Sequence, residues 1–212
     1  MEMIKNIHWL GHDTFRITGG GKVVYTDPFR IENGKSGSSP EADLVLITHE
    51  HYDHCSPEDV GKIAGPNTVI VCPADSTGKF AGATGVKPGD RLNAAGVDIE
   101  AVPSYNTNKK FHPREKEWVG YIFTIGGKRI YIAGDTDHIP EMKGFKADIA
   151  LLPVSGTYVM TAEEAASAAL DIKPEVAIPM HYGSVVGTAE DAGRFKKLLG
   201  GKIEVVILNR EG

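Results

Sequence analysis

The sequence has few cysteines, no long apolar run and no excess of positive charge. Only Cys55 and Cys72 occur among 212 residues, which excludes a disulfide-rich scaffold and favours a reducing compartment. The apolar runs are too short to span a membrane, and Met1–Lys5 lack the pattern of a signal peptide. We therefore expect a cytoplasmic protein without a membrane span. The formal net charge of −5 at pH 7 also argues against general nucleic-acid binding, which favours a basic surface.

What remains is an ordinary globular composition, with 41% hydrophobic and 24% charged residues. A chain of 212 residues can bury a sizeable core. We predict one domain over residues 1–212, made of two closely packed halves at about 1–96 and 97–212. In both halves strands come first and then mix with helices. This order indicates an α+β fold in which two packed sheets carry helices on the outside.

Segments in which apolar and polar residues alternate, separated by turn-forming residues, predict the individual elements. Strands are expected at residues 4–10, 15–18, 23–26, 44–48, 68–73, 86–92, 97–102, 118–125, 129–133, 148–154, 176–180 and 203–208. Pro88-Gly89-Asp90 should interrupt the strand at 86–92 with a turn. Helices are expected at about 57–64, 76–80, 161–172 and 188–199. The glycine- and serine-rich residues 31–39 are expected to form a surface loop that could cover the site.

The strongest chemical signal is the segment at residues 48–55, THEHYDHC, which follows the apolar run at 44–47. Ser56 and Pro57 then have the pattern of a helix start. A strand therefore ends, a loop rich in metal-ligating side chains follows, and a helix begins. Loops at the carboxyl ends of strands are where α/β proteins place their chemistry.

The ligand types and their spacing predict a metal site. Imidazole and carboxylate groups suit zinc and other divalent transition metals. His49 and His51 are two apart in an extended segment, so their side chains point the same way and can hold one ion. Asp53 and His54 come after the turn and can reach a second ion beside it.

His49, His51, Asp53 and His54 form the pattern H-x-H-x-D-H after an apolar strand, and in this the chain resembles the metallo-β-lactamase-fold superfamily of metal-dependent hydrolases. The resemblance implies a four-layer αββα sandwich. It also implies one or two zinc ions, with manganese or iron as alternatives. The longer loop in residues 105–121 is similar to that of small metallo-hydrolases near the ascorbate-phosphate-lactonase-like group.

Three further residues end strands and extend the expected site. Asp135 follows Gly134, which removes side-chain bulk beside it, and the resemblance makes Asp135 the ligand that bridges two ions. His181 is implied as the last histidine of the second ion's set. Asp27 is expected to support the ligand loop by accepting a hydrogen bond from a metal-bound histidine, with a turn cap as the alternative.

The third ligand of the first ion is the open position. Asn106 stands nearest to the family's histidine but is a poor zinc ligand. His112 follows in the same loop, and we predict it as the ligand, which requires the loop to fold back over the site. The alternative is that His112 is a lid residue and the first site is poor in metal. His12, in a turn, is expected to be a simple turn residue rather than a support to the site.

These residues predict a metal-dependent hydrolase that uses a metal-bound hydroxide on a small ester, lactone, amide or phosphodiester. Asp53 is expected to orient the nucleophile, and Tyr182 and Asn106 to donate hydrogen bonds to the developing oxyanion. A basic cluster beside His112 could attract an anionic substrate, although a solvated loop is the commoner explanation. The cluster consists of Lys109, Lys110, Arg114 and Lys116.

The sequence gives less support to other classes of function. A nuclease-type phosphodiesterase conflicts with the acidic balance, and a diiron-type oxidoreductase of this superfamily carries glutamate where this chain has His51. A non-catalytic metal sensor would not need so complete a ligand set. The expected partner is a small-molecule substrate, with no nucleic acid and no membrane. Homo-oligomerisation and the substrate's identity are left open by the sequence.

Overall fold

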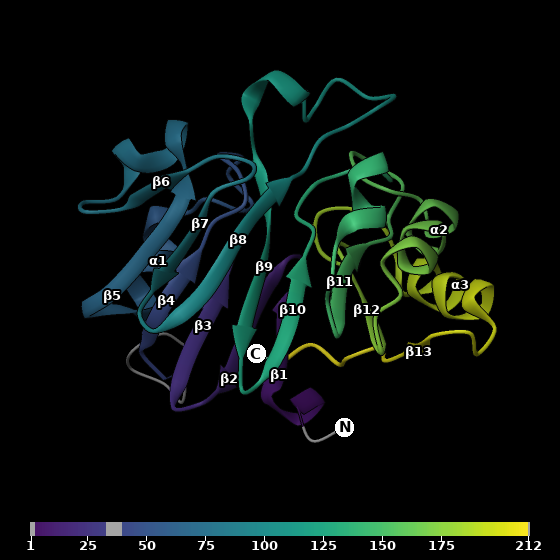
Figure 1. Ribbon diagram of the computed structural model, residues 1–212, viewed down its shortest axis with the longest axis horizontal. Helices are drawn as coiled ribbons and strands as arrows, with labels where there is room; N and C mark the ends of the chain where they lie inside the picture. The colour runs from purple at the N-terminus through teal and green to yellow at the C-terminus, as the bar shows by residue number, and fades with distance from the viewer. Residues whose placement is uncertain (1–2, 33–39, 212) are drawn as a thin grey trace.

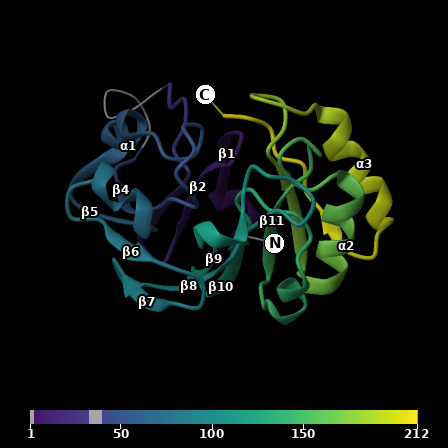
Figure 2. The same ribbon diagram turned by 90° about the horizontal axis from the view of Figure 1, so that it is seen from above.

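Two β-sheets pack face to face and helices cover their outer faces, so the fold is the expected α+β sandwich of four layers (Figure 1 and Figure 2). The computed structural model describes residues 3–32 and 40–211. Apart from Ile31 and Glu32, the loop predicted at residues 31–39 lies outside these residues. No helix within the two described ranges is both long and apolar enough to cross a membrane.

The first sheet has the strand order β1-β2-β3-β4-β5-β6. Its first three strands are antiparallel neighbours joined by short turns, whereas β3 to β6 run parallel to one another. The strands are β1 (Ile7–Gly11), β2 (Thr14–Gly19), β3 (Lys22–Thr26), β4 (Ala42–Leu46), β5 (Ala64–Pro73) and β6 (Thr84–Val86).

The second sheet has the order β13-β12-β11-β10-β9-β8-β7. Strands β7 to β10 are antiparallel, and β10 to β13 are parallel. The strands are β7 (Arg91–Ala94), β8 (Val97–Pro103), β9 (Val119–Ile125), β10 (Lys128–Ile132), β11 (Ile149–Pro153), β12 (Val176–Met180) and β13 (Glu204–Val205).

Three α-helices form the outer layers (Figure 2). Helix α1 (Pro57–Ile63) covers the first sheet, and α2 (Ala162–Ile172) and α3 (Ala189–Leu199) cover the second. A capping box is present at the start of α2, with the Glu164 backbone N–H donating to Thr161 Oγ1 at 3.2 Å. Four 3₁₀ turns complete the described elements: η1 (Met3–Asn6), η2 (Ala74–Lys79), η3 (Arg114–Lys116) and η4 (Pro140–Gly144).

The apolar strand that precedes the ligand loop is buried on both faces. Leu44 and Leu46 belong to the large core between the sheets, whereas Val45 and Ile47 pack in a smaller core with the residues of α1. Successive side chains of a strand point to opposite faces, so a strand covered on both sides reads as a continuous apolar run. This double burial fixes where β4 ends and where the ligand loop begins.

Several predicted element boundaries were wrong, among them the start of β5, which is Ala64 and not residue 68. The strand expected at 4–10 starts only at Ile7, because residues 3–6 form η1. The segment at 86–92 is not one interrupted strand: β6 ends at Val86 in the first sheet and β7 begins at Arg91 in the second. The Pro88-Gly89-Asp90 turn is therefore the crossing between sheets. The final strand, expected at 203–208, is only Glu204–Val205.

The start of α1 is tied to the chain that leaves β3. Asp59 is 6% exposed, and its carboxylate accepts hydrogen bonds from the backbone N–H groups of Arg30 and Ile31, both at 3.0 Å. Ser56 Oγ and Lys62 Nζ donate to it at 2.8 Å each. Burial by itself would raise the pKa of Asp59, but these donors hold it below its ordinary value.

We expect Asp59→Asn to lower the free energy of unfolding by about 1–3 kcal/mol at neutral pH, since it removes charge-assisted hydrogen bonds from a buried group. The pKa of Asp59 is lower in the folded state than in the unfolded state. The ionised carboxylate therefore stabilises the folded protein at pH values above the unfolded-state pKa. The difference from wild type should shrink as pH falls through the folded-state value. Urea unfolding at several pH values measures this difference in the free energy of unfolding.

The control is Glu58→Gln, on the same helix with an exposed side chain, and its free energy of unfolding should change little. A loss in Asp59→Asn that persists unchanged at low pH would contradict the ionic explanation.

Candidate metal centre

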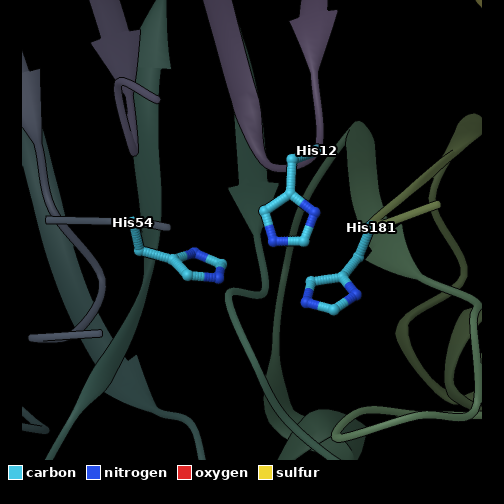
Figure 3. Close-up of side chains that lie close together, drawn as sticks. All are labelled: His12, His54 and His181. Carbon is cyan, nitrogen blue, oxygen red and sulfur yellow. The ribbon is translucent and has the colours of Figure 1, made fainter. Parts of the chain in front are cut away.

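The residues predicted from strand ends converge on one site. His49–His54 follow β4 and Asp135 follows β10, while His181 follows β12. Figure 3 shows His54 and His181 with the ring of His12, from the turn between β1 and β2, and all three rings border one common space. The centre is thus assembled from both sheets.

Distances between the candidate ligand atoms match those around a bound metal ion. His49 Nε2 lies 3.0 Å from His51 Nδ1, and Asp135 Oδ1 lies 3.1 Å from His181 Nε2 and 3.3 Å from His54 Nε2. With metal–nitrogen bonds of about 2.0–2.1 Å, neighbouring ligands of a tetrahedral ion lie about 3.3–3.4 Å apart. Asp135 Oδ2 also lies 3.9 Å from His49 Nε2, so this carboxylate faces both histidine sets. This is the position that a bridging ligand requires.

Polar atoms without hydrogen-bond partners collect at the same place. Among the described residues, the buried side-chain atoms without a partner include His54 Nε2, Asp135 Oδ1, His181 Nε2 and both ring nitrogens of His112. Leaving such an atom unpaired costs about 1–3 kcal/mol. Divalent cations would satisfy His54 Nε2, Asp135 Oδ1, His181 Nε2 and one ring nitrogen of His112, so the donor set fits transition-metal ions.

Asp27 is hydrogen-bonded to the ligand loop, and these bonds fix the tautomers of two histidines. Its carboxylate accepts hydrogen bonds from Thr48 N–H at 2.7 Å, Thr48 Oγ1–H at 2.6 Å and His54 Nδ1–H at 2.8 Å. Because the single hydroxyl hydrogen of Thr48 goes to Asp27, its oxygen must accept from His49 Nδ1–H at 2.9 Å. The Nε2 lone pairs of His49 and His54 are therefore both free to bind metal.

The site contains strained backbone at three residues and a close contact between Gly134 and Thr48. His12, Asp27 and His181 have φ values of +53°, +37° and +60°, a region that non-glycine residues rarely adopt. Such strain persists where the surrounding structure over-determines it. At Gly134, with φ +62°, a Cβ atom would lie 2.9 Å from Thr48 Cβ. The bulk that this glycine removes would therefore collide with Thr48, the residue that links Asp27 to His49.

The loop that carries His112 does fold back over the site. The backbone N–H of His112 donates to Asn106 Oδ1 at 3.0 Å, and that of Asn106 donates to the His112 carbonyl at 2.7 Å. The buried His112 ring lies 4.6 Å from the His49 ring and 4.4 Å from that of Trp118, centroid to centroid. The structure thus places His112 beside the first histidine pair.

A buried aspartate organises this loop. Asp137 accepts hydrogen bonds from Lys109 Nζ at 2.5 Å, Thr107 N–H at 2.7 Å and Asn106 Nδ2–H at 3.2 Å. The second Nδ2 hydrogen of Asn106 goes to the Tyr158 carbonyl at 2.8 Å. Both amide hydrogens of Asn106 are therefore used inside the protein. This geometry favours a loop-positioning role for Asn106 over donation to an oxyanion.

The candidate ligands fall into two groups according to their charge. Burial lowers the pKa of His49 well below 6.5 and that of His112 to about 3, so both imidazoles are neutral at pH 7. Burial also opposes ionisation of Asp135, but His181 and His54 hold the pKa of that carboxyl well below its usual range. Asp135 in turn raises the pKa of His54 and of His181 against the effect of burial. A metal ion would take the place of those protons.

Sequence reasoning missed several residues at the centre. Ser155 Oγ lies 3.1 Å from His181 Nδ1, and Trp118 packs against the rings of His49, His51 and His112. The view of His12 as a simple turn residue was wrong, because its side chain is buried between His54 and His181. Tyr182 is 4% exposed, and its ring packs against that of Trp9 in a tilted arrangement, 4.8 Å from centroid to centroid. It is not among the residues that line the pocket described below.

A sandwich of two mixed sheets with a His/Asp metal centre at the strand ends defines a class of metal-dependent hydrolases. A family model described as a beta-lactamase superfamily domain matches residues 6–181. A UPF0173 metal-dependent hydrolase of Pyrococcus abyssi is 34% identical and covers 97% of this chain and 96% of its own length. A UPF0173 metal-dependent hydrolase of Thermoplasma acidophilum is 36% identical, and the match covers 94% of this chain and 92% of that protein. A crystal structure from Parabacteroides distasonis is 38% identical, with a TM-score of 0.85 over 95% of this chain and 91% of that one.

The chain therefore belongs to the metallo-β-lactamase superfamily and, within it, to the UPF0173 metal-dependent hydrolases. This confirms the resemblance drawn from the H-x-H-x-D-H segment and the fold inferred from it.

We expect Asp27→Asn to weaken metal binding by about 10–100-fold, since it removes the carboxylate that orients His54 and, through Thr48, His49. Competition with a chromogenic chelator measures the affinity. The matched control is Asp43→Asn near the start of β4, where Asp43 Oδ2 accepts a hydrogen bond from the Val23 backbone at 2.8 Å, far along the strand from the ligands. An Asp27→Asn protein that binds metal as tightly as wild type would contradict this role.

Proposed function

We propose that this protein is a hydrolase with two divalent ions, zinc being the first candidate and manganese or iron the alternatives, and that its substrate is a small uncharged ester, lactone or amide. The observation that supports it is a pocket of about 260 Å³ that opens directly on His51, Asp53 and Asp135. Reacting atoms in this pocket would lie against both candidate metal sets.

The ligand assignment follows the two sets. His49, His51 and His112 would hold the first ion, and Asp53, His54 and His181 the second, with Asp135 between them. When bound, the two ions supply an activated water and polarise the scissile bond.

Asp53 is the residue of the chain best placed to act on the attacking water. Its side chain lines the pocket and is 13% exposed. Burial alone would raise the pKa of Asp53, but His12 and His54 lower it below the ordinary value, so it is an anion at neutral pH. A carboxylate there can accept a hydrogen bond from the water and hold it for attack. We assign Asn106 to positioning His112 and Tyr182 to packing on Trp9, because neither lines the pocket.

Three of the four bases in the basic cluster are paired with carboxylates. Lys109 pairs with Asp137 at 2.5 Å, Arg114 with Glu141 at 3.0 Å and Lys116 with Glu50 at 3.2 Å. The fourth, Lys110, is exposed and has no ion pair among the described residues. Because the three pairs reduce the positive charge of this loop, they favour an uncharged substrate over the anionic one that the sequence suggested.

The pocket wall is aromatic. Tyr52, Phe111 and Tyr158 line it together with Val185, and the rings of Phe111 and Tyr158 meet edge to face at 4.7 Å. Phe111 and Tyr52 are 54% and 68% exposed, which leaves their faces available to a ligand. The volume lies below the ~300–1,000 Å³ typical of drug-sized ligands. A small substrate with one aryl or apolar group fits this wall.

The alternatives make different demands on the site. A nuclease would need a row of positive charges for the phosphate backbone, and three of the four bases in the cluster are already paired with carboxylates. A diiron-type oxidoreductase would be recognised by oxygen consumption without hydrolysis. We also propose a reducing, cytoplasmic location, supported by two buried free cysteines, Cys55 and Cys72.

Removal of metal should abolish hydrolysis. Protein dialysed against a chelator is expected to lose turnover of phenyl acetate and of a γ-lactone, and to regain it on addition of zinc, manganese or iron(II). The same panel should include bis(p-nitrophenyl) phosphate, which we expect to be the poorest substrate because it is anionic. Full activity in the metal-free protein would contradict the proposal, and preferred cleavage of the phosphodiester would replace its substrate class.

Phe111→Ala and Tyr158→Ala should each raise KM for phenyl acetate about 2–10-fold, as expected for one lost aromatic contact, and leave kcat nearly unchanged. KM for methyl acetate, which lacks the ring, should barely change. Leu198→Ala, at an exposed position on α3, is the control. Equal losses for both substrates would show that the aromatic wall supports the loop and does not bind substrate.

A further inference from the structure

The turn between β1 and β2 brings an additional imidazole to the second ion's set. His12 stands in this turn with its side chain 1% exposed and its φ at +53°. Its backbone carbonyl accepts hydrogen bonds from Trp9 Nε1–H at 2.9 Å and from the His181 backbone N–H at 3.3 Å. The turn is thus held firmly against the chain that carries His181.

The ring of His12 lies among the ligands of the second set (Figure 3). Its centroid is 4.1 Å from the His181 ring and 5.0 Å from the His54 ring. One nitrogen from each of these three histidines lies within 4.8 Å of the other two. His12 Nε2 is also 3.2 Å from Asp53 Oδ2.

The distance to Asp53 fits shared coordination of an ion as well as a hydrogen bond. At 3.2 Å it is at the long end of the range for N–H···O hydrogen bonds, whereas His54 Nδ1 contacts Asp27 at 2.8 Å. It also falls within the 3.0–3.3 Å range of the other contacts between candidate ligand atoms. His12 Nδ1 has no hydrogen-bond partner among the described residues, so within these residues the hydrogen bond with Asp53 is the only one that the ring makes.

The neighbouring Asp13 adds to the demand for a cation. It is fully buried, and neither carboxylate oxygen has a hydrogen-bond partner within residues 3–32 and 40–211. Asp13 Oδ2 lies 3.9 Å from His54 Nδ1, and one of its oxygens is within 4.8 Å of His54 and Asp135 ligand atoms. Burying an acid there is costly unless positive charge lies close.

We propose that His12 is a ligand of the second ion, so that this ion has five protein donors: His12, Asp53, His54, Asp135 and His181. The proposal rests on the proposed function only for the presence of an ion at this place. Five donors with nitrogen and oxygen atoms suit divalent ions that accept five or six ligands, such as cobalt(II), manganese(II) or iron(II), and zinc when its coordination expands. The second site should therefore bind such ions more tightly than the first.

Cobalt(II) titration of the metal-free protein tests the assignment, because the intensity of its visible absorption rises as the coordination number falls. The two variants are His12→Gln and His12→Ala. Glutamine keeps an N–H that can donate to Asp53 but is a poor ligand. We expect both variants to lose at least tenfold in affinity at one of the two sites and to show a more intense cobalt spectrum at that site. His8→Gln, an exposed histidine at the other end of β1 that contacts Glu211, is the matched control and should bind as wild type.

If His12→Gln binds cobalt(II) with the wild-type affinity and spectrum, His12 only donates to Asp53 and the proposal is overturned. Where a variant fails to fold by circular dichroism, a crystal structure of the cobalt-loaded wild type decides: His12 Nε2 at bonding distance supports the proposal, and a longer separation overturns it. The readout is binding, so it is separate from activity. A wild type that binds the second ion through His12 but hydrolyses none of the panel would refute the proposed function and leave this assignment standing.

Discussion

The hydrogen bonds that Asp27 accepts are the contacts on which the rest of the centre depends. This carboxylate is fully buried at the end of β3, and burial raises its pKa, while donors from Thr48 and His54 favour its anion. Because Thr48 gives its only hydroxyl hydrogen to Asp27, His49 must give its Nδ1 hydrogen to Thr48. One carboxylate therefore fixes the tautomer of a histidine in each metal set. Loss of its charge would disturb both sets together.

The second sheet holds the ligand loop in place from the opposite side. The Val119 backbone N–H donates to the Thr48 carbonyl at 3.1 Å, and Tyr121 Oη–H donates to the Ile47 carbonyl at 2.7 Å. Both donors belong to β9, so the ligand loop of the first sheet is hydrogen-bonded to the second sheet. These bonds offset the unfavourable φ values and unpaired nitrogens of the centre, which a free loop could not maintain.

Sequence could predict the residues whose position follows from a strand end. The 48–55 loop, Asp27, Asp135 and His181 each come directly after an apolar strand, and parallel strand ends meet at one edge of a sheet. His12 has no such signal, since its proximity to His181 arises from how turns of the two sheets pack. Ser155 does follow a strand end, because β11 is the parallel neighbour of β12 in the same sheet. The strand expected at 86–92 was misread for a similar reason: local alternation does not reveal that the chain changes sheets at Pro88-Gly89. The assignment of His112 as a ligand and the division into halves at 1–96 and 97–212 stay predictions.

In the loop at residues 105–116, ion pairs change the role that the basic side chains can have. From the sequence its lysines and arginine predict a surface for anions. In the structure, however, three of these four bases pair with carboxylates from separate places: Asp137 after β10, Glu141 in η4 and Glu50 in the ligand loop. These charges fix a segment that carries both His112 and Phe111. The same segment thus supplies a candidate metal ligand and the aromatic wall of the pocket. A substitution that reshapes the wall must therefore keep the Asn106–Asp137 hydrogen bonds, because His112 is held through Asn106. Selectivity can change freely at the exposed Phe111 side chain, whereas changes to the loop backbone would also affect the metal centre.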